Sequence, residues 1–353
     1  MTVIPVLALN SGSSSLKFGL YRVGPSTLET LLSGETEAAG DAQRDAVAHV
    51  GRLLAERELP APAAVGHRVV HGGPGLRRHA LIDAEVLRRL EAATPFAPLH
   101  LPPALAVIRY ARERFPQARH AACLDTAFHA GLPEVARVLP LPKALRAEGV
   151  ERYGFHGLSC ESIVRRLGRD LPRRLVIAHL GNGASVTAVQ DGRSIDTTMG
   201  LTPTGGLVMG TRCGDLDPGV LLYLMREKGY DRARIEDLVD HRSGLLGISG
   251  LDGDMRRLRE AARSSADARL AIEMFRYSAR KHVAAMIAAL GGVDLLVFTG
   301  GIGEHDAQVR DAICRGLACP VRVLAAEEEA QIARHARELM PDGPSRRHHS
   351  SLR

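Results

Sequence analysis

Two arginine-containing segments have the residue types needed to hold an anion. The segment GHRVVHGG at residues 66–73 places Arg68 between two histidines, and MGTRCGDLDPG at residues 209–219 places Arg212 between glycines. Arginine makes planar, bidentate contacts with carboxylates and phosphates, and its charge stabilises a phosphoryl group during transfer. A structural ion pair would explain either arginine if it stood alone. The two together direct attention to anionic ligands.

Three glycine-containing segments could approach phosphates through their backbones. They are NSGSSSLK at residues 10–17, HLGNGAS at residues 179–185 and TGGIGE at residues 299–304. The first offers backbone N–H groups, hydroxyls and Lys17, but it lacks the spacing of a P-loop, and a Ser/Gly hairpin would explain it alone. We expect glycine turns at the ends of strands, where a positive φ is permitted. Three such turns favour nucleotide binding.

Further polar residues stand in apolar or glycine-flanked contexts. Asp125 closes a buried-looking strand, and His156 lies in YGFHG. Such a concentration of polar groups favours one shared cleft. The acidic run at residues 327–329 precedes AQIARHAREL, an amphipathic helix. First-turn acids stabilise a helix dipole, and one of these three could also reach Mg²⁺.

The first two glycine-containing segments, residues 10–17 and 179–185, are flanked by sequences that resemble one another. Residues 3–9 and 15–23 read as a hairpin around a tight polar turn, and a second copy begins at Leu175. Placing Ala8 on Ala178 also puts Ser15 on Ser185, without a gap. This similarity predicts a duplicated domain. In the second copy, Asp191-Gly192 predicts a type I′ turn before the next strand.

The remaining elements alternate between helices and strands. Residues 83–92 and 102–115 predict amphipathic helices, and residues 120–125 a buried strand. Asp217 and Pro218 form an N-cap and first-turn pair. Residues 272–290 keep helical spacing, and the following strand enters Gly300-Gly301-Ile302-Gly303. This alternation predicts an α/β fold.

Composition narrows the classes of function. The chain has 353 residues, 45% hydrophobic and 24% charged, which is enough for two domains with separate cores. The net charge of +6 is dispersed, aromatic residues are 4% and Trp is absent, so we expect no nucleic-acid partner.

Cysteine spacing and hydropathy give expectations about location. Five cysteines without a CxxC pair predict no disulfide framework and a cytoplasmic location. The most apolar stretch, residues 283–298, is interrupted by two glycines and an aspartate, so we expect no membrane span. Residues 345–353 predict a solvated tail.

The ordered set of motifs resembles the acetate kinase (acetokinase) family across nearly the whole chain. The motifs are LNSGSSSLK (9–17), GHRVVHGG (66–73), APLHLPP (97–103), LDTAFH (124–129), YGFHG (153–157), HLGNGAS (179–185), MGTRCGDLDPG (209–219) and TGGIGE (299–304). The resemblance implies an α/β fold of two duplicated ribonuclease-H-like (actin-like ATPase) domains with a central cleft, and a homodimer. The implied domains are an acyl-acceptor-side domain of residues 1–126 plus 330–353 and a nucleotide-binding domain of residues 127–329.

The resemblance also implies site residues. Catalytic roles fall on Asp125, His156 and Arg212. The carboxylate and methyl group of the acceptor fall to Arg68, Val70, Leu99, Phe155 and Pro203. Nucleotide binding falls on Lys17, His179, Leu180, Gly181, Asn182, Gly183, Asp254, Met255, Arg256, Gly301, Ile302, Gly303, Glu304 and His305. Asn10 and Glu328 are the implied metal residues, with Mg²⁺ as the metal and Mn²⁺ able to substitute.

The activity implied by the resemblance is reversible transfer of phosphate from ATP to acetate, giving ADP and acetyl phosphate. Propionate kinase is the first alternative. The second is a weakly active nucleotide-binding homologue, because the segment between Leu317 and Val321 is shorter than the family pattern. The chain also departs from the family pattern at Leu158 and Cys160, in TPTGGL at 202–207 and in GIGEH at 301–305.

Overall fold

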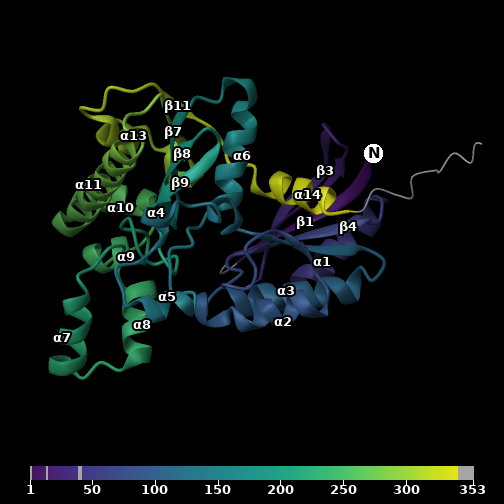
Figure 1. The fold of residues 1–353 in the computed structure, drawn as a ribbon, viewed down its shortest axis with the longest axis horizontal. Coiled ribbons are helices and arrows are strands. Elements are labelled where there is room, and N and C mark those ends of the chain that lie inside the picture. The colour runs from purple at the N-terminus through teal and green to yellow at the C-terminus, as the bar shows by residue number, and fades with distance from the viewer. Residues whose placement is uncertain (1, 13–14, 39–41, 341–353) are drawn as a thin grey trace, which may run out of the picture. The chain divides into compact units, whose positions relative to one another are not determined.

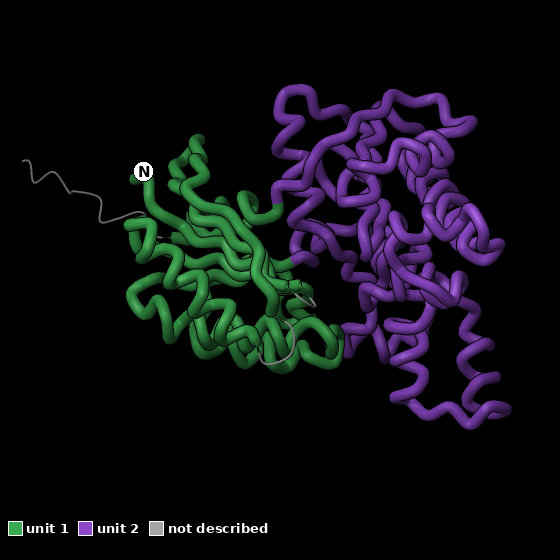
Figure 2. Tube along the Cα trace, turned by 180° about the vertical axis from the view of Figure 1, so that it is seen from behind, with its two compact units in different colours: residues 1–124, 328–353 green, residues 125–327 purple. Residues whose placement is uncertain are grey.

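The computed structural model describes residues 2–12, 15–38 and 42–340 (Figure 1). The predicted tail at residues 345–353 lies outside the described residues. The chain divides into two compact units (Figure 2). Unit 1 comprises Met1–Leu124 and Glu328–Arg353, and unit 2 comprises Asp125–Glu327. No helix in the described ranges is both long and apolar enough to cross a membrane.

Unit 1 is built on a six-stranded sheet in the order β3-β2-β1-β4-β6-β5. Its strands are β1 (Ile4–Ser11), β2 (Ser15–Val23), β3 (Leu28–Glu37), β4 (Ala64–Val69), β5 (Ala80–Leu81) and β6 (Arg119–Leu124). Its helices are α1 (Gln43–Glu56), α2 (Ala84–Ala92), the 3-10 turn η2 (Thr94–Phe96), α3 (Leu101–Arg114) and α14 (Glu328–Glu338).

The two faces of this sheet are covered by different helices. Alternating side chains of β1 and β2, including Leu9 and Phe18, form one core with residues of α1 and α3. On β1, β2, β4 and β6 the sheet also contacts α14. A Cβ at Gly66 would lie 2.6 Å from Ile332 Cγ2 of α14, so this helix packs directly on the backbone of β4. The last described helix therefore completes the N-terminal unit.

Unit 2 is built on a five-stranded sheet in the order β11-β10-β7-β8-β9. Its strands are β7 (Arg174–Leu180), β8 (Ala184–Gln190), β9 (Arg193–Thr197), β10 (Leu295–Thr299) and β11 (Val321–Val323). Its α-helices are α4 (Glu134–Arg137), α5 (Lys143–Ala147), α6 (Gly157–Leu167), α7 (Pro218–Lys228), α8 (Arg232–His241), α9 (Gly244–Ser249), α10 (Met255–Ala261), α11 (Ala266–Ala289), α12 (Gly300–His305) and α13 (Ala307–Cys314). Two 3-10 turns are η3 (Ala127–His129) and η4 (Gly168–Asp170).

The two sheets share one topology. In each, the first three strands form an antiparallel meander, and the first strand also pairs in parallel with the fourth. The orders β3-β2-β1-β4-β6 and β9-β8-β7-β10-β11 are therefore equivalent. Helix α6 packs its buried residues against β7 and β10 in unit 2. The predicted duplication is confirmed at the level of topology.

The gapless alignment of the two hairpins is wrong. In unit 1, Ser11 pairs with Leu16, which leaves residues 12–15 between the paired positions. In unit 2, Leu180 pairs with Ala184, which leaves residues 181–183. The turn of unit 2 is thus one residue shorter. Because side chains alternate along a strand, this difference reverses which of the aligned residues share a face.

Local signals placed most other elements correctly. The Asp83 carboxylate accepts a hydrogen bond from Val86 N (2.8 Å) at the start of α2, and Asp217 accepts one from Gly219 N (2.9 Å) at the start of α7. Asp191 (φ 49°) and Gly192 (φ 77°) form the left-handed pair that a type I′ turn requires.

The segment Gly300-Gly301-Ile302-Gly303 differs from the predicted glycine turn. Only Gly300 has a positive φ, of 78°, and the chain then continues as helix α12. The positive φ at Gly300 redirects the chain from β10 into this helix. Gly181 and Gly183 do not have positive φ angles either, so their small size, rather than a left-handed backbone, is what the structure uses.

Candidate active site

In unit 1, the side chain of Asn10 links an arginine to two carboxylates. Asn10 lies near the end of β1 and is 6% exposed. Its Nδ2 donates to Glu328 Oε2 (3.1 Å) and Glu329 Oε1 (2.8 Å), and its Oδ1 accepts from Arg68 Nη1 (3.2 Å). The structure therefore brings together three predicted site residues and adds Glu329. Glu327 does not join them, because it pairs with Arg166 in unit 2 (3.5 Å).

The other predicted residues of unit 1 differ in their exposure. Lys17 is the cross-strand partner of Asn10 and is exposed. Directly paired residues of an antiparallel ladder project to the same face, so Lys17 lies on the α14 side of the sheet. Val70, just after β4, is buried, whereas Leu99 in the loop before α3 is 45% exposed.

A buried pair of histidines lies beside Arg68 in the sequence. His67 Nε2 and His120 Nδ1 are 3.0 Å apart, and the two rings stack with centroids 5.3 Å apart. His120 Nε2 donates to the Phe115 carbonyl (3.3 Å). Burial holds the pKa of His67 well below its ordinary value and also lowers that of His120. Both rings are therefore neutral at physiological pH, and they serve as packing and hydrogen-bonding groups.

In unit 2, His156 occupies an unusual backbone conformation. It immediately precedes α6 with φ 58° and ψ 26°, a left-handed geometry that is uncommon outside glycine. Its Nδ1 is 2.9 Å from Ser185 Oγ of β8, and its ring stacks on His179 with centroids 4.2 Å apart and planes inclined by 19°. His179 Nδ1 is 2.8 Å from Ser159 Oγ. Two predicted site histidines thus form one stacked pair.

Arg212 reaches the same turn. A Cβ at Gly183 would lie 3.3 Å from Arg212 Nη1 and 3.4 Å from His156 Nε2. The guanidinium and the imidazole therefore both lie next to this glycine. Arg212 Nη1 also donates to the Pro203 carbonyl (3.2 Å). The turn and the Arg212 loop are joined by a bond from Gly210 N to the Asn182 carbonyl (3.0 Å). The predicted phosphate-contacting residues of unit 2 therefore converge.

His129 supports the backbone that carries His156. It is 1% exposed, with Nε2 2.9 Å from the Phe155 carbonyl and Nδ1 2.8 Å from Ser194 Oγ. Burial lowers its pKa to about 4. A Cβ at Gly154 (φ 73°) would lie 2.7 Å from Cγ of the His129 ring, so this glycine lets the imidazole approach the chain.

Asp125 and the two unit 2 residues predicted for the methyl pocket are also buried. Asp125 follows β6 and is 1% exposed, and its carbonyl accepts from Gly157 N at the start of α6 (2.9 Å). The backbone of Asp125 is thereby tied to the residue after His156. Phe155 and Pro203 are both buried.

A pocket of about 920 Å³ lies in unit 2, beside the turn at residues 181–183 and the Arg212 loop. The predicted nucleotide residues that line it are Gly181, Asn182, Asp254, Met255, Arg256, Gly301, Ile302 and His305. Thr211, Leu246, Leu251, Asp252, Gly253, Arg259 and Asp306 complete the lining. The volume of this pocket and its mixture of apolar and hydrogen-bonding groups are typical of pockets that bind small ligands.

The other predicted nucleotide residues of unit 2 do not line this pocket. Leu180 and Gly303 are buried, and His179 takes part in the stacked pair. Glu304 is a structural residue, because its Oε1 accepts from Gly300 N (3.0 Å) and fixes the start of α12.

Charged groups on the pocket wall are arranged by helix capping. Asp254 caps α10 by accepting from Arg256 N (2.7 Å), and its carboxylate pairs with the Arg256 guanidinium (2.6 Å). The hydrogen bond from this guanidinium lowers the pKa of Asp254. Asp306 caps α13 and pairs with Arg259. With its pKa lowered, the Asp254 carboxylate is ionised at neutral pH.

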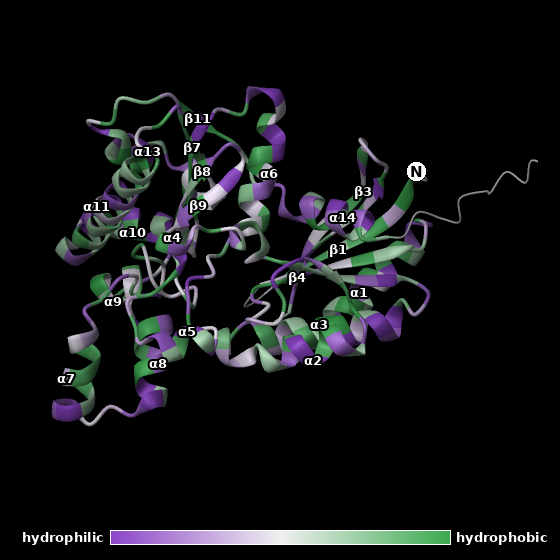
Figure 3. Cartoon of the chain, viewed as in Figure 1, coloured by the Kyte–Doolittle hydropathy of each residue, from purple (hydrophilic) through white to green (hydrophobic). Residues whose placement is uncertain are grey.

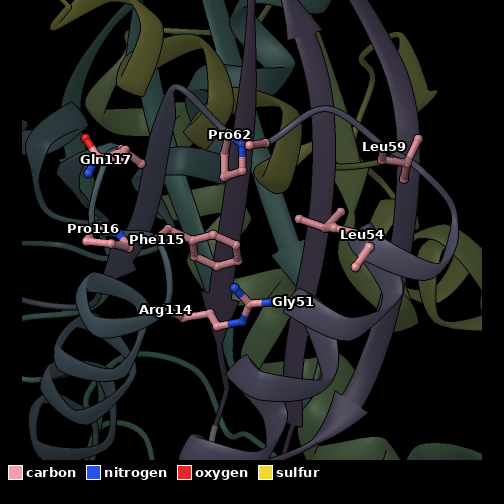
Figure 4. Close-up of a pocket in the computed structure, with 11 residues that line it drawn as sticks. Gly51, Leu54, Leu59, Pro62, Arg114, Phe115, Pro116 and Gln117 are labelled. Carbon is pink, nitrogen blue, oxygen red and sulfur yellow. The ribbon is translucent and has the colours of Figure 1, made fainter.

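A second pocket, in unit 1, has a different character (Figure 4). It has a volume of about 340 Å³ between the end of α1 and the segment after α3. Its walls include Leu54, Leu59, Pro62 and Phe115, with Arg114 at one side (Figure 4). Its lining contains none of the predicted site residues, so it does not belong to the candidate active site.

The sequence alone assigns no role to Ser159, Ser185 or His129, and it leaves Glu329 as one of three acidic candidates for the metal. Ser159 and Ser185 contact the stacked imidazoles, Glu329 contacts Asn10, and His129 holds the Phe155 carbonyl. A signal existed for Glu329, which lies in the acidic run, and for His129, which ends the LDTAFH motif. Ser159 carries no comparable signal, and Ser185, although it ends the HLGNGAS motif, gains its role only when folding brings it to a histidine.

Comparison with known proteins gives consistent matches. The acetokinase family model matches residues 33–339. Acetate kinase from Methylocella silvestris is 44% identical over 349 residues, covering 88% of this chain and 86% of that protein. Acetate kinase from Deinococcus deserti is 46% identical over 338 residues, covering 87% and 84%.

Solved structures are similar over almost the entire chain. A propionate kinase from Francisella tularensis has a TM-score of 0.88 and 34% identity, covering 96% of this chain and 100% of that one. An acetate kinase from Porphyromonas gingivalis has a TM-score of 0.84 and 32% identity, covering 95% and 99%.

Proposed function

Because the chain belongs to the acetokinase family, we propose that it transfers the γ-phosphoryl group of ATP reversibly to acetate, giving ADP and acetyl phosphate. The observation that carries this proposal is the meeting of Arg212 Nη1 and His156 Nε2 at Gly183. Two donors at a glycine that leaves the backbone open suit phosphoryl oxygens. The adjoining pocket has room for a nucleotide.

Unit 2 supplies the nucleotide and phosphoryl contacts in this proposal. Gly181, Asn182 and Gly183, together with Gly301, Ile302 and His305, approach the phosphates, while Asp254, Met255 and Arg256 bind the nucleoside. Arg212 and His156 stabilise the charge that the equatorial oxygens carry during in-line transfer. Acetate is already ionised at neutral pH, so no general base is needed, and Asp125 orients neighbouring groups.

Unit 1 supplies the acceptor contacts. Arg68 binds the acetate carboxylate, because guanidinium and carboxylate form parallel hydrogen bonds. The bond from Arg68 to Asn10 holds this side chain in place. Val70 and Leu99 are the unit 1 residues, and Phe155 and Pro203 the unit 2 residues, that we propose to give the methyl group an apolar surface. Such a surface favours short acids, and the similarity to a propionate kinase makes propionate the second candidate.

The carboxylates of unit 1 fit a magnesium ion. Glu328 and Glu329 both converge on Asn10, and Mg²⁺ requires only one or two protein carboxylates besides phosphate and water. Bound there with ATP, Mg²⁺ or Mn²⁺ would neutralise charge on the phosphates. Asn10, Glu328 and Glu329 are the residues that would hold it, and Lys17 on the same face would bind phosphate.

A homodimer in the cytoplasm is the state we propose for the protein. All five cysteines are free thiols, which suits a reducing compartment. Every residue of α7 is at least partly exposed, and Figure 3 shows hydrophobic stretches along it. Its exposed apolar side chains include Val220, Leu222 and Met225. We expect this apolar surface to bury itself against a second copy.

Sedimentation would test the dimer. Val220→Glu with Leu222→Glu should convert the dimer to monomers, whereas Val135→Glu, at a residue 92% exposed on α4, should not. A parent protein that sediments as a monomer would refute this part of the proposal.

The activity is tested with MgATP, hydroxylamine and acetate, propionate or butyrate, by measuring acyl hydroxamate. We expect acetate to give the highest kcat/KM. Absence of product with every acid would refute the kinase, and nucleotide binding without product would support a regulatory protein. Arg212→Ala should reduce kcat by at least about a hundredfold, the scale of losing one transition-state donor. Arg256→Ala, at the pocket wall, should mainly raise KM for ATP.

A further inference from the structure

Three imidazoles of unit 2 share one arrangement. In each, a serine hydroxyl lies within hydrogen-bonding distance of Nδ1, and Nε2 is the second polar atom of the ring. The pairs are His129 with Ser194 (2.8 Å), His156 with Ser185 (2.9 Å) and His179 with Ser159 (2.8 Å). A serine can donate or accept, so the proton positions depend on what faces Nε2.

His129 shows which ring nitrogen carries the hydrogen in this arrangement. Its Nε2 faces the Phe155 carbonyl, which can only accept, so Nε2 carries the hydrogen. Burial lowers the pKa of this ring to about 4, so it is neutral at pH 7. Nδ1 is then an acceptor, and Ser194 must be the donor. In this pair the serine hydroxyl stabilises the Nε2–H tautomer.

The same reasoning extends to the stacked pair. His156 Nε2 would be 3.4 Å from a Cβ at Gly183, and His179 Nε2 would be 3.9 Å from one at Gly181. Both ring edges therefore lie beside the turn at residues 181–183. The phosphate oxygens proposed to bind there accept hydrogen bonds, so each Nε2 must carry a hydrogen.

Charge then decides between a neutral ring and an imidazolium. The two rings are stacked at 4.2 Å, and the Arg212 guanidinium lies at the same glycine as His156 Nε2. Like charges at such distances disfavour protonation. A neutral ring with hydrogen on Nε2 has a bare Nδ1, which the Ser185 or Ser159 hydroxyl can satisfy.

We propose that Ser185 and Ser159 are positioning residues that hold His156 and His179 as neutral Nε2–H donors toward the transferred phosphoryl group. The proposal rests on the proposed phosphoryl transfer. Each serine fixes the tautomer and orientation of its imidazole, as Ser194 does for His129. The two donors are then available without a proton from solvent, and their donor capacity does not change over the pH range in which histidine ordinarily titrates.

Nuclear magnetic resonance tests the tautomers without activity. In the full chain with ¹⁵N-labelled histidine, long-range ¹H–¹⁵N correlations distinguish Nε2–H, Nδ1–H and imidazolium forms. His156→Gln and His179→Gln assign the signals. We expect both rings as Nε2–H at about pH 7.5 in the parent, and a tautomer mixture for His156 in Ser185→Ala. An Nδ1–H form or an imidazolium in the parent would overturn the proposal.

Kinetics supply a second readout, with acetyl phosphate followed by ³¹P spectroscopy. Ser185→Ala should lower kcat about twofold to tenfold, the scale of one hydrogen bond, with less change in KM for ATP. The ratio of variant to parent kcat should rise from about pH 8 to about pH 6. In the variant, a ring that carries its hydrogen on Nδ1 regains a donor at Nε2 when it is protonated, because an imidazolium carries hydrogen on both nitrogens. Ser185→Thr should restore part of the loss.

Ser162→Ala is the matched control, since Ser162 lies on the same helix as Ser159 but donates to the Ser159 carbonyl. Its kcat ratio to the parent should not vary with pH. A constant ratio for Ser185→Ala across this range would indicate a merely structural serine and overturn the proposal. If the parent forms no acetyl phosphate, the proposed function fails, while the tautomer measurement still judges the serines.

Discussion

Acid should destabilise unit 2 through His129, the imidazole behind His156. Its folded-state pKa is about 4 because burial disfavours the charged ring, against an ordinary value of 6.5. The unfolded chain therefore takes up a proton first as the pH falls. Stability from this residue is complete above about pH 6.5, declines between about pH 6.5 and about pH 4, and is lost below that range.

The size of the effect follows from the pKa difference. Each pKa unit corresponds to about 1.4 kcal/mol, so lowering the pKa from 6.5 to about 4 is worth about 3 kcal/mol. Because the ring is 1% exposed, solvent screening does not reduce this figure much. The loss is a substantial part of the stability of an ordinary domain.

A matched variant isolates this contribution. His129→Gln keeps a donor for the Phe155 carbonyl and an acceptor for Ser194, but it does not titrate. Urea unfolding followed by far-ultraviolet circular dichroism should give a free energy that falls less steeply with acid in the variant. His67 and His120 titrate in the same direction in both proteins, so the difference between them removes that background.

The expected difference approaches one bound proton, or about 1.4 kcal/mol per pH unit near pH 5. At pH 8 the variant should be modestly less stable, by about 1 kcal/mol. Parallel stability curves for parent and variant between pH 7 and pH 4.5 would refute the assignment of a neutral buried imidazole at His129.

Three substitutions test other parts of the structure. Asn10→Ala should lower kcat at least about tenfold and raise the Mg²⁺ concentration for half-maximal rate, since it removes the amide that holds Arg68 and both carboxylates; a magnesium titration checks this, and an unchanged titration would contradict it. Gly183→Ala places a Cβ 3.3 Å from Arg212 Nη1, so kcat should fall about tenfold or more while thermal stability changes little; full activity would show that Arg212 acts elsewhere. Gly300→Ala should cost about 1–3 kcal/mol in urea unfolding, because its φ is 78° and the Leu180 carbonyl would lie 2.8 Å from the new Cβ.

The fold was accessible from sequence where local chemistry was decisive. The hairpin β1-β2 is read from a polar turn between alternating strands, and the start of α7 from Asp217 before Pro218. The ordered motifs gave the family, which comparison confirmed. The gapless repeat was wrong because short matches between small residues do not determine hairpin register, which depends on the length of the turn.

The candidate site was accessible only in part. Arg68, His156 and Arg212 stand in recognisable motifs, and the structure places the last two at one glycine. Ser185 could not be singled out, since a serine in a strand matters only once its hydroxyl meets a ring from another element. The sequence predicts a turn at the Gly300 segment because glycines lack the side chains that would mark helical spacing. In the structure, only Gly300 has a positive φ, and α12 begins at that residue. The functional roles of these residues remain predictions.

Unit 1 is made of an early and a late segment of the chain, which has a consequence for synthesis on the ribosome. Strand β4 leaves its Gly66 backbone to be covered by Ile332 of α14, a helix translated after all of unit 2. Domains generally fold as they emerge, so unit 2 can fold while one face of the earlier sheet is still uncovered. Glu328 and Glu329 arrive with that same helix. A nascent chain therefore covers the second face of its N-terminal sheet and acquires its two proposed carboxylate ligands in one late event.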